Sequence, residues 1–295
     1  MLPLITTQEL ARALNESGAG SRWLILDVRW RLGGPPADVD YRVGHIPGAL
    51  FVDLETVLAD PPGAGGRHPI PEAEVLAGRF AGLGVSDTTT VVVYDDRDGS
   101  VAARAWWLLR WLGLPARQVR VLDGGYAAWI DEDRPVSDAI AGSTVGNFTA
   151  RPGSMPVLDA DASARAASRG TLLDARAPAR YLGDTEPVDP RAGHIPGARN
   201  APFAEHVGPD GRWRSPEDLA AHYRGLGVTE VGEVGAYCGS GVTATSIVLA
   251  VEYAGLRSPE HPIALYPGSW SQWSSDPARP VSVGPEPESE TGANR

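Results

Sequence analysis

The chain of 295 residues contains one cysteine, Cys238, and its surroundings suit a nucleophile. It follows the apolar run Glu233–Tyr237, typical of a buried strand, and precedes Val242–Ala254, which is predicted to form a largely buried helix. In a glycine-rich turn from strand to helix, backbone N–H groups point inward and favour an anion. A cysteine that opens such a turn is expected to react as its thiolate, although lone cysteines are more often small buried apolar residues. We therefore predict that Cys238 is a catalytic nucleophile.

The residues after Cys238 form a candidate active-site loop that consists of Gly239, Ser240, Gly241, Val242 and Thr243. The two glycines leave room for a second sulfur atom and for close approach of the backbone. Backbone N–H groups of this loop are expected to stabilise negative charge on sulfur. The hydroxyls of Ser240 and Thr243 can bond that sulfur or relay a proton.

Other sites of comparable chemistry lack the residues that they need. A cysteine phosphatase needs an arginine six positions after its cysteine, where this chain has Ala244. No Gly-x-Ser-x-Gly elbow of a serine hydrolase occurs, and the chain has no lysine for a phosphate-binding Gly-Lys-Ser/Thr loop. A single cysteine excludes an internal disulfide and gives little support to a cysteine-based zinc site, so we expect no metal site.

The chain repeats itself after about half its length. Gly44–Ala49 and Gly193–Ala198 both read GHIPGA, and Gly82–Val85 and Gly225–Val228 both read GLGV. Two further pairs match in the same order: Trp23–Arg29 with Gly170–Arg176, and Gly124–Trp129 with Gly268–Trp273. This period is far too long for a solenoid, so the sequence indicates a duplicated domain.

Each copy alternates apolar runs with amphipathic segments of helical length. We predict strands over Trp23–Val28, Thr90–Tyr94 and Thr171–Asp174, and helices over Glu72–Gly82 and Ala102–Leu112. Such alternation predicts an α/β fold in which each domain has a mainly parallel sheet with helices on both faces.

The predicted domains cover residues 1–136 and 157–283, with a linker at 137–156 and a disordered, acidic tail at 284–295. Only the second copy carries a nucleophile, because Asp95 occupies the position in the first copy that matches Cys238. We expect the first domain to form one wall of the active-site pocket.

The charge of the chain limits its partners. It has 26 basic and 37 acidic residues, a formal net charge of −11, which opposes general affinity for nucleic acid or an anionic membrane surface. No apolar stretch approaches the ~20 residues of a membrane span, and the first residues lack the pattern of a signal peptide. We therefore expect a cytoplasmic protein that binds neither nucleic acid nor membrane, while a small anionic substrate stays possible.

The duplicated domain, both GHIPGA segments and the loop Cys238–Thr243 resemble the tandem rhodanese family over residues 4 to 283. Within that family, members that use thiosulfate tend to carry basic residues just after the cysteine. The neutral loop of this chain is similar to that of the 3-mercaptopyruvate sulfurtransferases. A neutral loop also suits mercaptopyruvate, which has a single carboxylate, better than the thiosulfate dianion.

The resemblance implies a sulfurtransferase that works by double displacement. Cys238 takes a sulfur atom from 3-mercaptopyruvate or thiosulfate as a persulfide and passes it to cyanide or to a thiol such as reduced thioredoxin. The intermediate is a covalent persulfide, so no separate cofactor is implied. Two alternatives stay open: a thiosulfate sulfurtransferase, and a relay that receives persulfide from one protein and hands it to another.

Two arginines are candidates for holding the donor's carboxylate. Arg180 matches the family's first substrate arginine, whose guanidinium can hold a carboxylate through two hydrogen bonds. The family's second arginine usually follows a Glu-Pro pair, but here Glu186-Pro187 is followed by Val188. Arg191, slightly further along the chain, is the candidate for that role.

His45 is a candidate for a proton relay, by analogy with relatives that use a histidine of the first domain. Its expected partners are Ser240 and either Asp38 or Asp40. Because His194 occupies the same position in the second copy, a structural role shared by both histidines is the alternative.

Overall fold

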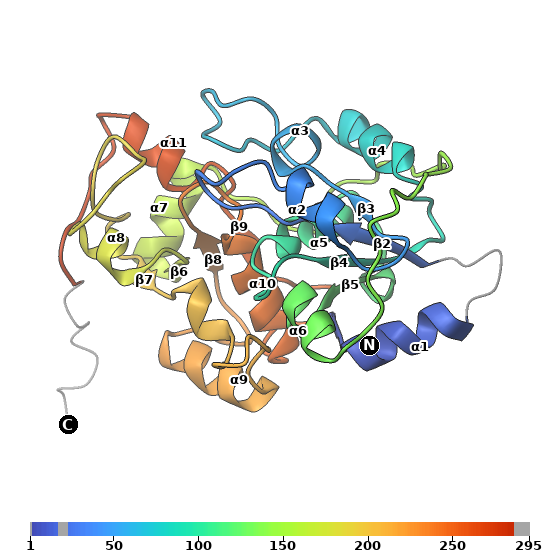
Figure 1. The fold of residues 1–295 in the computed structure, drawn as a ribbon. Coiled ribbons are helices and arrows are strands. Elements are labelled where there is room, and N and C mark those ends of the chain that lie inside the picture. The colour runs from blue at the N-terminus through green and yellow to red at the C-terminus, as the bar shows by residue number, and fades with distance from the viewer. Residues whose placement is uncertain (1, 17–22, 286–295) are drawn as a thin grey trace.

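The computed structural model describes residues 2–16 and 23–285, and within them each domain is built on one parallel sheet (Figure 1). The N-terminal sheet has the strand order β1-β5-β4-β2-β3 and the C-terminal sheet the order β7-β6-β8-β9, with every strand pair parallel. The strands are β1 (Leu4–Ile5), β2 (Trp23–Asp27), β3 (Leu50–Phe51), β4 (Thr90–Tyr94), β5 (Val119–Leu122), β6 (Thr171–Asp174), β7 (Arg199–Asn200), β8 (Val234–Tyr237) and β9 (Ala264–Leu265).

Helices connect the strands and cover the sheets. In the N-terminal domain they are α1 (Thr7–Glu16), α2 (Asp38–Val43), α3 (Leu54–Val57), α4 (Ala73–Gly82), α5 (Ala102–Trp111), the 3₁₀-helix η1 (Ala116–Gln118) and α6 (Gly125–Asp131). In the C-terminal domain they are α7 (Ala160–Arg169), α8 (Pro178–Leu182), the 3₁₀-helix η2 (Phe203–His206), α9 (Pro216–Gly225), α10 (Ala244–Tyr253) and α11 (Ser269–Ser275).

Both faces of each sheet are buried, as predicted from the apolar strands. Along β4, Val91 and Val93 belong to one hydrophobic cluster, while Val92 and Tyr94 belong to another on the opposite face. Side chains of successive strand residues point to opposite faces, so this alternation places a core on each side of the sheet. The predicted α/β class, with parallel sheets and helices on both faces, is confirmed.

The two domains share one continuous core, in which α5 contacts α10 (Figure 1). The same cluster contains Trp106 of α5 and Ile247 of α10. A buried ion pair also joins these helices, because Arg110 Nη1 lies 2.6 Å from Glu252 Oε2. The pocket described below is therefore enclosed by two domains that are packed tightly together.

The predicted linker, residues 137–156, contains no helix or strand but is fastened to the N-terminal domain. Gly146 N–H donates to Ala81 O, and Arg151 N–H donates to Leu112 O, each at 2.8 Å. Most of the predicted tail, residues 286–295, lies outside the described residues. Within 2–16 and 23–285, no helix has the length and apolar character required to cross a membrane.

Candidate active site

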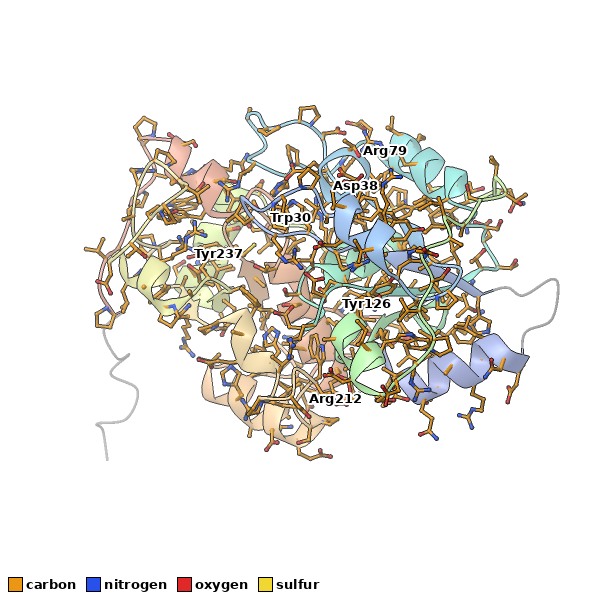
Figure 2. All side chains as sticks on the ribbon, viewed as in Figure 1. Trp30, Asp38, Arg79, Tyr126, Arg212 and Tyr237 are labelled. Carbon is orange, nitrogen blue, oxygen red and sulfur yellow. The ribbon has the colours of Figure 1, made fainter. Side chains whose placement is uncertain are left out.

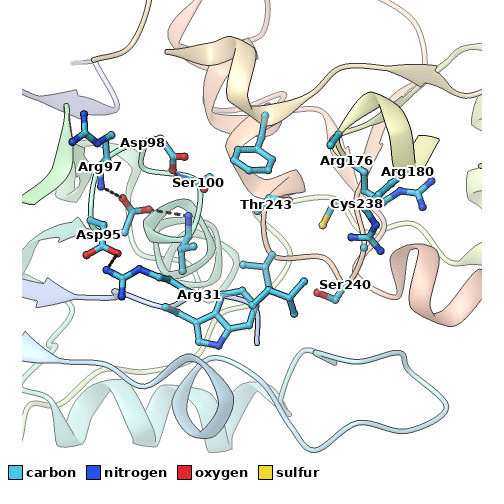
Figure 3. A pocket seen from close by; sticks show the side chains of 18 of the residues that line it. Arg31, Asp95, Arg97, Asp98, Ser100, Arg176, Arg180, Cys238, Ser240 and Thr243 are labelled. Atoms are coloured by element: carbon cyan, nitrogen blue, oxygen red, sulfur yellow. Dashed lines mark hydrogen bonds and ion pairs between the residues drawn. The ribbon is translucent and has the colours of Figure 1, made fainter. Parts of the chain in front are cut away.

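Cys238 follows β8 directly, and it lines a pocket between the two domains while its own surface is 2% exposed (Figure 3). The segment that begins α11 fixes its backbone. Cys238 N–H donates to Ser269 Oγ at 3.1 Å, and Trp270 N–H donates to Cys238 O at 2.9 Å. The repeated segment Gly268–Trp273 therefore positions the predicted nucleophile.

The loop after Cys238 turns tightly into α10. Gly241 N–H donates to Cys238 Sγ at 3.1 Å, so the turn supplies a backbone donor to the sulfur. The backbone of Gly241 has φ +78°, and a Cβ atom there would lie 2.3 Å from Pro267 O. Only glycine fits this position, which explains one of the two glycines of the loop.

The N-terminal domain has the same turn with a carboxyl group in place of the thiol. The Asp95 carboxyl oxygens accept hydrogen bonds from four backbone N–H groups between residues 97 and 102, at 2.9–3.1 Å. Burial raises the pKa of Asp95 above its ordinary value, whereas the N–H bonds lower it. In the C-terminal domain this turn presents Cys238. In the N-terminal domain the N–H groups of the matching turn bind the carboxyl group of Asp95 instead.

The pocket beside Cys238 has a volume of about 400 Å³ and is lined by both domains (Figure 3). The N-terminal domain contributes Trp30, Arg31, Leu32, Arg67, Asp95, Asp96, Arg97, Asp98, Ser100 and Val101. The C-terminal domain contributes Arg176, Ala177, Arg180, Phe203, Cys238, Gly239, Ser240, Val242 and Thr243. The expectation that the first domain forms one wall of this pocket is confirmed.

Arg180 lines the pocket close to Cys238 and is held by two acidic side chains (Figure 3). Its Nη2 lies 2.6 Å from Glu186 Oε1 and 3.0 Å from Asp189 Oδ2. Asp189 also binds Arg67 of the N-terminal domain, with 2.6 Å between Arg67 Nη1 and Asp189 Oδ1. One buried carboxylate therefore joins two pocket arginines that come from different domains.

Arg191 is not at the pocket, so its prediction as the second substrate arginine is wrong. Its guanidinium donates to four backbone carbonyl oxygens at and beyond the end of α11, those of Trp273, Ser274, Asp276 and Arg279, at 2.6–3.0 Å. These bonds use all three nitrogens of the guanidinium, which therefore holds the end of that helix. Of the arginines that line the pocket, Arg67 is the one that joins Arg180 beside Gly239.

The histidine beside Ser240 is His68, which the sequence analysis missed. Its Nδ1 lies 2.7 Å from Ser240 Oγ, and its Nε2 lies 3.3 Å from Glu55 Oε1. Burial lowers the pKa of His68, and Glu55 acts in the opposite direction. His68 is 2% exposed, whereas the Glu55 side chain is 50% exposed. Ser240, His68 and Glu55 therefore link the pocket to solvent.

The predicted relay through His45 is corrected by the structure. His45 Nδ1 lies 2.8 Å from Tyr41 O and Nε2 lies 3.2 Å from Ala139 O, and its ring stacks on Tyr41. His194 has the same stacking on Tyr181, so both histidines support the GHIPGA turn.

The acidic partners proposed for His45 are also engaged elsewhere. Asp38, labelled on the N-terminal domain in Figure 2, pairs with Arg42, and Asp40 pairs with Arg31. Neither carboxylate is hydrogen-bonded to a histidine in the part of the chain that the structure describes.

Arg104 of α5 lies behind the active-site loop and is completely buried. It donates to Gly241 O at 3.1 Å, to His68 O at 3.1 Å and to Leu58 O at 3.2 Å. Burial lowers the pKa of Arg104 to about 10, and the thiolate of Cys238 acts in the opposite direction. Arg104 is therefore a buried cation at neutral pH, and it fastens the Cys238 turn to the His68 segment.

A signal for Arg67 and His68 was present in the repeat. Gly66-Arg67-His68 matches Gly211-Arg212-Trp213 of the second copy, and the two copies differ at the histidine. Residues that take part in a reaction carried out by only one copy are expected at positions where the two copies differ. Among the described residues, no cluster of His, Cys, Asp and Glu side chains could hold a metal ion.

Comparison with known proteins supports this assignment of the fold. The sequence pattern of the rhodanese-like domain matches residues 6–132 and again residues 159–276. In the crystal structure of SseA from Escherichia coli, described as a 3-mercaptopyruvate sulfotransferase with the rhodanese fold, 92% of this chain superposes on the whole of that chain. The TM-score is 0.78 at 30% identity.

Two bacterial relatives are similar over nearly their full length. A Pseudomonas aeruginosa protein named as a 3-mercaptopyruvate sulfurtransferase is 43% identical over 287 residues, which cover 95% of this chain and 98% of the relative. A Mycobacterium tuberculosis protein named as a thiosulfate sulfurtransferase, SseB, is 43% identical over 285 residues, which cover 95% of this chain and 97% of that relative.

Proposed function

The chain belongs to the rhodanese family of sulfurtransferases, and from that premise we propose that it transfers sulfur from 3-mercaptopyruvate through a persulfide on Cys238. The observation that carries this proposal is the placement of Cys238. Its sulfur accepts a backbone N–H bond in a turn that opens on a pocket where Arg67 and Arg180 lie beside the adjoining Gly239. The pocket therefore joins a supported thiolate to groups that bind a carboxylate.

In the first step, the Cys238 thiolate attacks the thiol sulfur of mercaptopyruvate. The S–S bond forms as the bond between that sulfur and its carbon breaks, and the electron pair leaves with the pyruvate enolate. One added proton converts the enolate to pyruvate. The enzyme retains a Cys238 persulfide, which the loop N–H groups stabilise.

In the second step, an acceptor thiolate attacks the outer sulfur of the persulfide. The bond between the two sulfurs breaks, the acceptor leaves as a persulfide, and Cys238 is again a thiolate. A thiol, reduced thioredoxin or cyanide can serve as the acceptor, and cyanide leaves as thiocyanate. No further cofactor takes part in either step.

Ser240, His68 and Glu55 supply the proton in this proposal. Burial lowers the pKa of His68, so its ring is neutral at pH 7 and can pass a proton between its two nitrogens. Ser240 Oγ faces one nitrogen and Glu55, which is half exposed, faces the other. A proton from solvent can thus reach the enolate by way of the Ser240 hydroxyl.

The charges beside Cys238 favour a donor with one negative charge. Arg67 and Arg180 are paired with the carboxylates of Glu186 and Asp189, and the loop carries no charged side chain, while buried Arg104 adds one positive charge behind the loop. A dianion such as thiosulfate gains less from this balanced cluster than a single carboxylate that is held by directed hydrogen bonds. Thiosulfate stays the second candidate donor because the mycobacterial relative is named as a thiosulfate sulfurtransferase.

The first prediction concerns the nucleophile. Purified protein is mixed with 3-mercaptopyruvate or thiosulfate alone for the intact mass, and then with cyanide as acceptor while pyruvate and thiocyanate are measured. We expect pyruvate release and a gain of one sulfur atom, with both lost in Cys238→Ser because an alcohol does not replace a thiolate here.

Other results would change the proposal in defined ways. Faster turnover with thiosulfate would keep the persulfide and overturn the preferred donor. If neither donor reacts but persulfide arrives from another protein, the chain is a relay and the proposed reaction is wrong.

A further inference from the structure

We infer that the donor's carboxylate binds between Arg67 and Arg180 above Gly239, so that each domain supplies one guanidinium. This inference rests on the proposed function and assigns Arg67 as a second substrate-binding residue. Sequence reasoning had looked for that residue in the C-terminal domain, at Arg191.

Each arginine has donors left over after its ion pairs are counted. Arg180 uses Nε and Nη2 to bind Glu186 and Asp189, which leaves Nη1. Arg67 uses Nη1 to bind Asp189, which leaves Nε and Nη2. Arg67 Nε is buried without any hydrogen-bond partner among the described residues. Because Nε is enclosed by the protein, Nη2 is the Arg67 nitrogen that is placed to meet a ligand beside Gly239.

The unused donors converge beside the nucleophile. A Cβ atom built on Gly239 would lie 3.2 Å from Arg67 Nη2 and 3.3 Å from Arg180 Nη1. Both guanidinium groups therefore reach the backbone next to Cys238, in the space that a side chain at this position would fill. Two nitrogens from separate guanidinium groups suit the two oxygens of a carboxylate.

Asp189 sets the spacing between the two arginines. Its side chain is 3% exposed, and its two oxygens bind the two guanidinium groups separately. Because Asp189 neutralises much of their charge, the arginines offer directed donors rather than a strong positive field. This arrangement favours an α-keto carboxylate over a small dianion.

Arg67 also precedes His68, so an effect of its removal on the proton relay has to be separated from an effect on binding. The methyl ester of 3-mercaptopyruvate makes that separation because it keeps the reacting thiol and ketone but lacks the carboxylate charge. A residue that binds the carboxylate affects the acid and not the ester. A residue that only positions His68 affects both donors equally.

The experiment compares the wild-type protein with Arg67→Met and with Arg42→Met, which removes a positive charge from an exposed ion pair on α2. For Arg67→Met, we expect the KM for mercaptopyruvate to rise by about 10- to 100-fold, as for loss of a charge-assisted hydrogen bond, with kcat within about threefold. The inhibition constant of pyruvate should rise in parallel. The ester should show no difference between the wild type and Arg67→Met, and Arg42→Met should match the wild type throughout.

The failures of this inference and of the proposed function give different results. An inactive wild-type protein would overturn the proposed function. An active wild type with an unchanged KM in Arg67→Met would overturn the assignment of Arg67. Equal losses with acid and ester would assign Arg67 to positioning alone and also overturn the inference.

Discussion

At the residue scale, Gly239 is the position whose lack of a side chain has the clearest consequence for the donor. Its backbone is not in the left-handed region, so alanine is permitted there, and the nearest atoms to the methyl group, apart from the adjoining residues, would be the ends of two arginines. We expect Gly239→Ala to fold normally but to raise the KM for mercaptopyruvate by about tenfold, because the methyl occupies the carboxylate's space.

The control for this prediction is Gly78→Ala, in α4, where an added Cβ meets nothing within 4 Å. Steady-state kinetics and the melting temperature of both variants check the prediction. A normal KM in Gly239→Ala would place the carboxylate elsewhere in the pocket.

Residues differ in how far the sequence could reveal their roles. Cys238 and its loop were predictable because their signal is local: an apolar strand, glycines and a helix in sequence. Arg67 and His68 act on that loop from the other domain, 171 and 170 positions away, and no local pattern records such a contact. Arg191 was misassigned because distance along the chain does not show that its guanidinium would be consumed by the end of α11.

At the element scale, most strands and helices near the site agree with prediction to within two residues. The predicted strand at Thr90–Tyr94 matches β4, and the predicted helix at Val242–Ala254 contains α10 (Ala244–Tyr253). Apolar runs with clear ends determine these elements. The positions of the loops are harder to predict from the sequence, because they depend on contacts with the opposite domain.

In each domain, one such loop packs against the other domain. The loop with Gly66 contacts the C-terminal domain, where Arg67 N–H donates to Ser271 Oγ at 3.0 Å. The matching loop with Gly211 contacts the N-terminal domain, since a Cβ there would lie 2.7 Å from Arg97 Cγ. Each loop therefore covers the turn of the other domain, but only the first covers a turn that carries a cysteine.

This arrangement gives a matched pair of variants, Gly66→Ala and Gly211→Ala. Both glycines have positive φ, +100° and +77°, so alanine costs about 1–2 kcal/mol of folding stability in either case. At Gly66 the methyl would also lie 2.7 Å from Gly268 O and push the loop away from Cys238. We expect kcat/KM to fall about 10- to 100-fold in Gly66→Ala, because the loop carries Arg67 and His68.

Gly211→Ala should keep most of its activity while losing a similar amount of stability. Denaturant unfolding and steady-state kinetics on both variants check this pair of expectations. Equal activity losses in the two variants would show that general destabilisation, not displacement of the first loop, is responsible.

At the scale of the whole molecule, the continuous core across α5 and α10 predicts that both domains unfold together. His206 lies close to their boundary, where its ring stacks on Trp213. The backbone N–H of Trp213 donates to Asp123 Oδ1 of the other domain at 2.8 Å. His206 Nε2 also contacts the hydroxyl of Tyr223. A positive charge on His206 would therefore be buried near the boundary between the two domains.

Burial lowers the pKa of His206 to about 3, and this makes the stability of the whole molecule sensitive to acid. Below the ordinary histidine pKa of about 6.5, the unfolded chain binds a proton at this residue that the folded protein does not bind. Stability contributed by neutral His206 is thus complete above pH 6.5 and is lost as pH falls toward 3. Between pH 7 and pH 5 the loss is about 2 kcal/mol, since each pH unit below 6.5 costs about 1.4 kcal/mol.

Denaturant unfolding of the wild type and of His206→Gln at pH 7 and pH 5 tests this prediction. Glutamine does not titrate, so the variant should be less stable at pH 7 but should lose about 2 kcal/mol less than the wild type on going to pH 5. His261→Gln, which removes an exposed histidine, should keep the wild-type pH dependence. If His206→Gln also keeps the wild-type pH dependence of stability, His206 accepts a proton in the folded protein, and the boundary between the domains admits water.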